Sequence, residues 1–90
     1  MILVKLRGKL EEKVKTAALS LCANLKQANT NKDILIVSVN PASHIKLRGN
    51  FYWQILLITN KVLDANVFIK NSLKEFRHSG IIVTVDVDPL

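Results

Sequence analysis

The alternation of hydrophobic and polar positions is clearest at the start of the chain, where Ile2, Val4 and Leu6 occupy every second position of residues 2–7. This period predicts a strand with one buried face. Three further runs rich in β-branched or aromatic residues predict additional strands: residues 34–39, 51–59 and 81–87. Gly8 is expected to end the first strand, and Asn40-Pro41 the second.

Two segments between these runs carry apolar residues at helical spacing instead. The first segment opens with Glu11 and Glu12, whose negative charge suits the first turn of a helix. Its predicted buried stripe is Val14, Ala17, Ala18, Leu21, Cys22, Leu25 and Ala28. A polar cluster, residues 29–33, is expected to end this helix.

The second predicted helix opens at residues 63–64. Asp64 is expected to be its N-cap, and Leu63 is expected to pack on Phe68 as a hydrophobic staple. The predicted inner stripe is Ala65, Phe68, Ile69, Ser72, Leu73 and Phe76. Arg77 and His78 are expected in the last turn, with Gly80 ending the helix.

The predicted order is strand, helix, strand, strand, helix, strand. Two right-handed split crossover units give an α+β, ferredoxin-like βαββαβ fold, a four-stranded antiparallel sheet with both helices on one face. In this arrangement the other face of the sheet carries no helices. It exposes the strand residues that alternate with the buried ones. The apolar residues expected there are Leu3, Ile36, Leu56 and Ile82, beside Lys5, Arg7, Tyr52, Gln54, Thr84 and Asp86. Such a face is either a docking surface or ordinary surface apolarity.

Composition indicates one ordered domain over residues 1–90, because 49% of residues are hydrophobic and only 3 are Gly and 2 Pro. No apolar run approaches the ~20 residues of a membrane span, and we expect no membrane partner. The single cysteine, Cys22, favours a reducing, cytoplasmic location. The net charge of +6 favours an anionic partner, nucleic acid first, although a merely basic domain would have the same charge.

The chain carries few residues in patterns that support catalysis. It has no GxxxxGK[ST] loop, and neither its two histidines nor Cys22 has the spacing of a zinc site, so we expect no cofactor and no enzyme activity in this chain. Asp86 and Asp88 share one strand face and would form either a metal pair or an acid/base pair. We favour a structural role, in which Asp86 pairs with Lys5 or Arg7 on the first strand and Asp88 lies where the last strand ends.

The strongest candidate site is the loop that leads into the third strand. His44, Lys46 and Arg48 lie just before Phe51-Tyr52-Trp53, and basic residues beside aromatic rings are typical of nucleic-acid binding. Tyr52 is expected on the exposed face, where its ring can stack on an unpaired base, whereas Trp53 is expected in the core. Arg48 either contacts DNA or pairs with a carboxylate. The next candidate DNA contacts are Lys5, Arg7 and Lys61.

Three segments together resemble the end of primosomal replication-restart helicases. The segments are Pro41-Ala42 followed by residues 47–57 (LRGNFYWQILL), the ending of residues 85–90 (VDVDPL), and Gly8 followed by residues 11–14 (EEKV). The resemblance covers essentially all of the chain. The family often has arginine where Asn50 and Tyr52 stand, and an acidic residue where Leu10 stands, so the basic strip here is thinner and a helix cap is missing.

The resemblance implies that residues 1–90 are the carboxy-terminal domain of an ATP-dependent DNA helicase that restarts replication at stalled or branched forks. It implies binding of branched or single-stranded DNA without sequence specificity, packing beside the helicase lobes, and proximity to the site that engages single-stranded-DNA-binding protein. The helicase motifs themselves would lie upstream. The alternative is a stand-alone ribosomal or RNA-binding protein of the same fold; a small acyl-phosphate hydrolase would need an anion loop that residues 7–10 do not resemble.

Overall fold

The structure is a computed structural model that describes residues 1–30, 32–42, 48–76 and 78–87. It confirms the predicted order of elements and the ferredoxin-like fold. The elements are β1 (Ile2–Gly8), α1 (Glu11–Ala28), β2 (Ile34–Pro41), β3 (Phe51–Thr59), α2 (Val62–Glu75) and β4 (Ile82–Val87).

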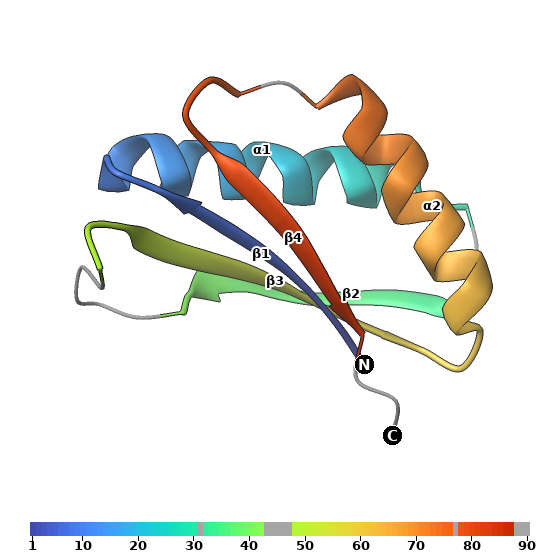
Figure 1. Ribbon diagram of the computed structural model, residues 1–90. Helices are drawn as coiled ribbons and strands as arrows, with labels where there is room; N and C mark the ends of the chain where they lie inside the picture. The colour runs from blue at the N-terminus through green and yellow to red at the C-terminus, as the bar shows by residue number, and fades with distance from the viewer. Residues whose placement is uncertain (31, 43–47, 77, 88–90) are drawn as a thin grey trace.

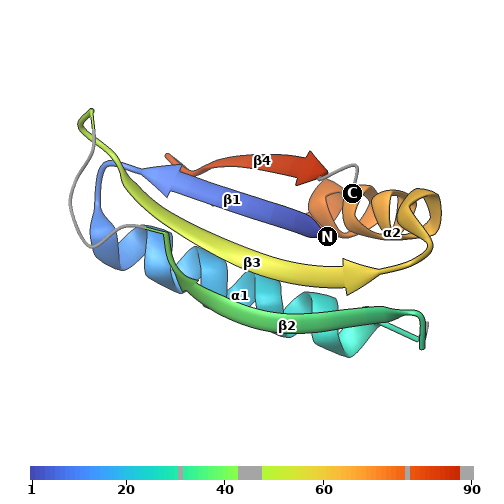
Figure 2. The same cartoon turned by 90° about the horizontal axis from the view of Figure 1, so that it is seen from below.

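The four strands form one antiparallel sheet in the order β2-β3-β1-β4. Both helices lie on the same side of this sheet, with α1 running along it and α2 at one end (Figure 1). Figure 2, turned to show the molecule from below, brings the helix-free face of the sheet in front of α1. We call this surface the open face. The two central strands, β1 and β3, therefore contribute the middle of the open face.

The core lies between α1, α2 and the sheet, as the two periodicities predict. Ile2, Val4 and Leu6 of β1 are fully buried against the predicted stripe of α1, in which only Ala28 is exposed. Trp53 is partly buried and packs against this core, which confirms its predicted position. No polar side chain is buried among the described residues, so the core is held by apolar packing alone.

The ends of α2 differ from the prediction. The helix begins at Val62 after Lys61, so Asp64 lies in its first turn and is not the N-cap. Leu63 is 80% exposed and forms no staple. The helix ends at Glu75, where the Phe76 N–H donates to the Leu73 carbonyl; His78 and Gly80 lie beyond it, and Gly80 takes its positive φ of 79° in the turn before β4. Arg77 lies outside the described residues.

A β-bulge in β2 corrects one prediction about the open face. Ile36 lies opposite Leu57, a core residue, but two positions later Ser38 lies opposite Leu56, so the register shifts between them. Because one inserted residue reverses the alternation of a strand, Ile36 packs against the core instead of lining the open face. The residue of β2 that takes its place on the open face is Leu35, opposite Ile58. The strand also continues through Pro41.

Candidate nucleic-acid interface

Along β1 and β3 the open face is divided into an apolar half and a polar half. The flanking strands do not follow this division, since Ser38 lies opposite Leu56, Asp86 opposite Leu3 and Ile82 opposite Arg7. In the apolar half, Leu35 lies opposite Ile58, and in the next row Leu56 lies opposite Leu3. Leu35 and Ile58 are 60% and 49% exposed. We define the apolar half by these four residues. Its position is set by the alternation of β3, whose Ile55 and Leu57 point into the core and leave Leu56 and Ile58 outside.

The polar half begins one row further along the same strands. There Gln54 of β3 lies opposite Lys5 of β1. In the last row Tyr52 lies opposite Arg7, and Arg7 in turn lies opposite Ile82 of β4. The structure therefore brings three of the predicted site residues, Lys5, Arg7 and Tyr52, onto two adjacent strands. We define the polar half by Lys5, Arg7, Tyr52 and Gln54.

Among the described carboxylates, that of Asp86 reaches this surface, and it is already paired. The Lys5 ammonium and the Asp86 carboxylate are 3.2 Å apart, which confirms the predicted structural role of Asp86 and identifies Lys5 as its partner. Their side chains are 43% and 64% exposed, so the pair contributes little to stability. Arg7, by contrast, forms no ion pair with any described carboxylate. Its guanidinium remains available to an anion. Asp88 lies outside the described residues.

The predicted basic loop adds one further cation at the same end of the sheet. Arg48 is exposed, and its φ of 50° places it in the left-handed region, followed by Gly49 with a φ of 81°. A non-glycine residue in this region costs about 1–2 kcal/mol, so the backbone holds Arg48 in an unusual turn. The Asn50 side chain donates a hydrogen bond of 3.4 Å to the Arg48 carbonyl. Lys46 and His44 lie outside the described residues.

Lys61 is separated from the other candidates. It follows the carboxyl end of β3, whereas Tyr52 stands near the opposite end of that strand. Its ammonium lies 3.2 Å from the Asp33 carboxylate, in a pair that joins the ends of β2 and β3. Lys61 therefore belongs to a different surface from Arg7 and Arg48.

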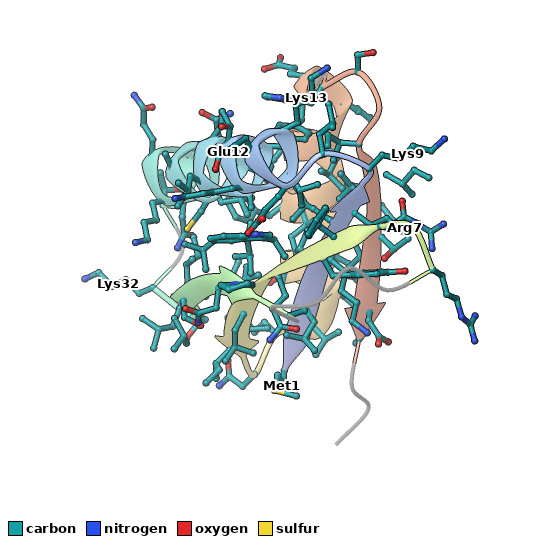
Figure 3. The ribbon with its side chains drawn as sticks, turned by 90° about the vertical axis from the view of Figure 1, so that its left-hand side faces the viewer. Met1, Arg7, Lys9, Glu12, Lys13 and Lys32 are labelled. Carbon is teal, nitrogen blue, oxygen red and sulfur yellow. The ribbon has the colours of Figure 1, made fainter. Side chains whose placement is uncertain are left out.

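The basic residues that Figure 3 labels do not form a single patch. In Figure 3, Arg7 and Lys9 project on one side of the molecule and Lys32 projects on the opposite side, while Lys13 lies near its top. The net charge of +6 is thus spread over several surfaces. What distinguishes the polar half is a partly exposed aromatic ring beside an arginine that pairs with no described carboxylate.

A hollow on the helix side is lined in part by residue types found in catalytic sites. It has a volume of about 340 Å³, and its lining includes Glu12, His78 and Ser79, residue types that form catalytic triads. No hydrogen bond or ion pair joins these three side chains within the described part of the chain. The His78 ring instead stacks on Phe76 with centroids 4.5 Å apart. The hollow therefore lacks the contacts that activate a nucleophile.

Within the four described ranges, no three His, Cys, Asp or Glu side chains come together as a metal site would require. In the same ranges, neither helix has the length and apolarity needed to cross a bilayer.

Neither a protein-family model nor a curated protein matches this chain. The assignment of a function therefore depends on the geometry of the open face and on the motifs in the sequence. Sequence reasoning missed Leu35 and Ile58 as open-face residues. For Ile58 the signal was present, since it continues the alternation of Tyr52, Gln54 and Leu56.

Proposed function

We propose that this chain is a DNA-binding and protein-docking module of the kind that ends a replication-restart helicase. The observation that carries the proposal is the division of the open face into the polar half and the apolar half. One surface thus offers two chemically different sites on adjacent rows of β1 and β3. The motif resemblance in residues 41–57 and 85–90 supports a helicase as the parent protein.

The polar half is suited to the phosphate backbone. Arg7 and Arg48 lie toward the same end of the sheet, and neither pairs with a described carboxylate. Arginine binds phosphate oxygens through paired N–H groups and reads no sequence in doing so. Binding of this kind has dissociation constants of about 10⁻⁴–10⁻⁶ M at physiological salt. The expected activity is therefore weak binding without base specificity, at stalled or branched forks.

The apolar half is suited to protein. Leu3, Leu35, Leu56 and Ile58 form a contiguous group at matched register positions, and exposed groups of this kind mark interaction sites. Helicase lobes of the parent protein are the proposed partner. Single-stranded-DNA-binding protein is a second proposed partner, on the resemblance alone.

A salt titration of binding tests the nucleic-acid half of the proposal. Fluorescence anisotropy would compare wild type with an Arg7→Gln/Arg48→Asn variant on a labelled duplex; asparagine is chosen because it tolerates the left-handed backbone of residue 48. Each lost phosphate contact should flatten the slope of log K against log salt by about 0.9, so the double variant should lose about 1.8. Lys61→Gln removes one charge at the other end of the sheet and is the matched control.

Two outcomes would count against this assignment. An unchanged slope in a folded double variant would place the phosphate contacts elsewhere. A loss of about 0.9 in Lys61→Gln, half that of the double variant for half the charge removed, would show that only net charge matters. Tighter binding to folded RNA than to branched DNA would favour the alternative of a ribosomal or RNA-binding protein.

A further inference from the structure

The most specific feature of the polar half is the pair formed by Tyr52 and Arg7. Tyr52 projects from β3 on the side opposite Phe51 and Trp53, which pack toward the core. Arg7 lies directly across from it on β1. Residues directly opposite in an antiparallel pair have Cβ atoms about 4.5–5.5 Å apart, so the guanidinium stands within reach of the edge of the ring.

An aromatic ring on a central strand of a four-stranded sheet is a surface on which bases stack. RNA-recognition modules with this strand arrangement bind two or three unpaired bases through rings on the open side of the sheet. Stacking requires that the face of the base be accessible, which a base inside a duplex does not offer. A guanidinium beside the ring can bind the phosphate that adjoins the stacked base.

The neighbouring rows limit the number of nucleotides that can bind beside this ring. In the row next to Tyr52, Gln54 and Lys5 can form hydrogen bonds, but Lys5 is paired with Asp86. In the row beyond, Leu56 and Leu3 have no group that binds a phosphate. The Asp86 carboxylate opposite Leu3 would repel one, which leaves the Ser38 hydroxyl, opposite Leu56 on β2, as the polar group of that row. On the two central strands, polar groups that could bind nucleic acid thus extend over two rows, and Lys5 in the second row is paired, which limits the site to a single nucleotide.

We infer that Tyr52 and Arg7 form a binding site for a single unpaired nucleotide, with the base stacked on the Tyr52 ring and its phosphate bound by Arg7. This inference rests on the proposed nucleic-acid function and adds a preference for single strands over duplex. The site discriminates by exposure of the base face and not by base identity, because every base presents a face to stack.

The test compares a labelled oligothymidylate with a duplex of the same length. Tyr52→Val keeps a strand-favouring residue but removes the ring, and should weaken single-strand binding about 5- to 150-fold while duplex binding changes less than about twofold. Tyr52→Phe retains the ring and should bind like wild type. Ile58→Thr changes an open-face residue of the same strand in the apolar half and should leave both affinities unchanged.

A second measurement needs no substitution. Irradiation of wild type bound to an oligonucleotide containing 5-bromodeoxyuridine should crosslink Tyr52, as located by mass spectrometry. Equal losses on single strand and duplex in Tyr52→Val, no loss at all, or crosslinks only at other residues would each overturn the inference. Failure of wild type to bind either probe would instead refute the proposed nucleic-acid function.

Discussion

Replacing Gly8 with alanine should destabilise the domain, although glycine-to-alanine changes often stabilise proteins. Gly8 ends β1 where the strand turns into α1, and it is buried. A Cβ atom at this position would lie 2.9 Å from Cδ1 of Ile81, 3.0 Å from Cγ2 of Val14 and 3.1 Å from the carbonyl oxygen of Gly80. Carbon atoms in contact prefer separations of about 3.5–4.0 Å, so the neighbours must move.

The size of the effect is the difference between two terms. Overpacking of this kind destabilises the folded protein by about 1–3 kcal/mol. Alanine also restricts the unfolded chain more than glycine does, which stabilises the folded protein by about 0.4–1 kcal/mol. We expect Gly8→Ala to lower the free energy of unfolding by about 1–2 kcal/mol. Since such a domain has only about 5–15 kcal/mol in total, the change is large. In urea, with a slope of about 1–3 kcal/mol per M, the unfolding midpoint should fall by roughly 0.3–2 M.

A double-mutant cycle separates crowding from other causes. Ile81→Val removes the Cδ1 atom nearest to the added methyl group, and by itself should cost about 0.5–1.5 kcal/mol. The double variant should be more stable than the sum of the two single effects by at least about 0.5 kcal/mol. Strict additivity, or a Gly8→Ala protein as stable as wild type, would refute the crowding argument. The contact with the Gly80 carbonyl remains in both backgrounds.

Three further predictions concern the open face and ATP hydrolysis. Asp86→Asn releases Lys5, so it should tighten DNA binding and steepen the slope of log K against log salt by up to about 0.9. The free energy of unfolding in urea should fall by less than about 1 kcal/mol, because the ion pair is exposed. Weaker DNA binding would contradict this prediction. Hydrogen exchange at the amides of Leu35 and Ile58 should slow when the lobes of a replication-restart helicase are added. A Leu35→Ser/Ile58→Ser variant should show no such slowing. Unchanged exchange in wild type would argue against docking on the apolar half. The chain should show no DNA-stimulated ATP hydrolysis in a phosphate-release assay, and measurable turnover by the purified chain would contradict this expectation.

The sequence by itself determined the order of the elements and most of the core. Its two hydrophobic periods are local properties, so Ile2, Val4 and Leu6 could be placed on a buried strand face and the stripe of α1 on a buried helix face without knowing their partners. The same alternation along β3 placed Trp53 toward the core and Tyr52 on the open side.

The tertiary structure alone decided which residues of different strands meet. The bulge in β2 reverses its alternation and exchanges Ile36 for Leu35 on the open face, because a shift of one residue turns every later side chain to the other side. Whether Asp86 pairs with Lys5 or Arg7 depends on the register between β1 and β4, strands at opposite ends of the chain. The register between β1 and β3 also places Tyr52 opposite Arg7, on which the nucleotide site depends. This register is set by hydrogen bonds between strands and by core packing, which act between residues far apart in the sequence.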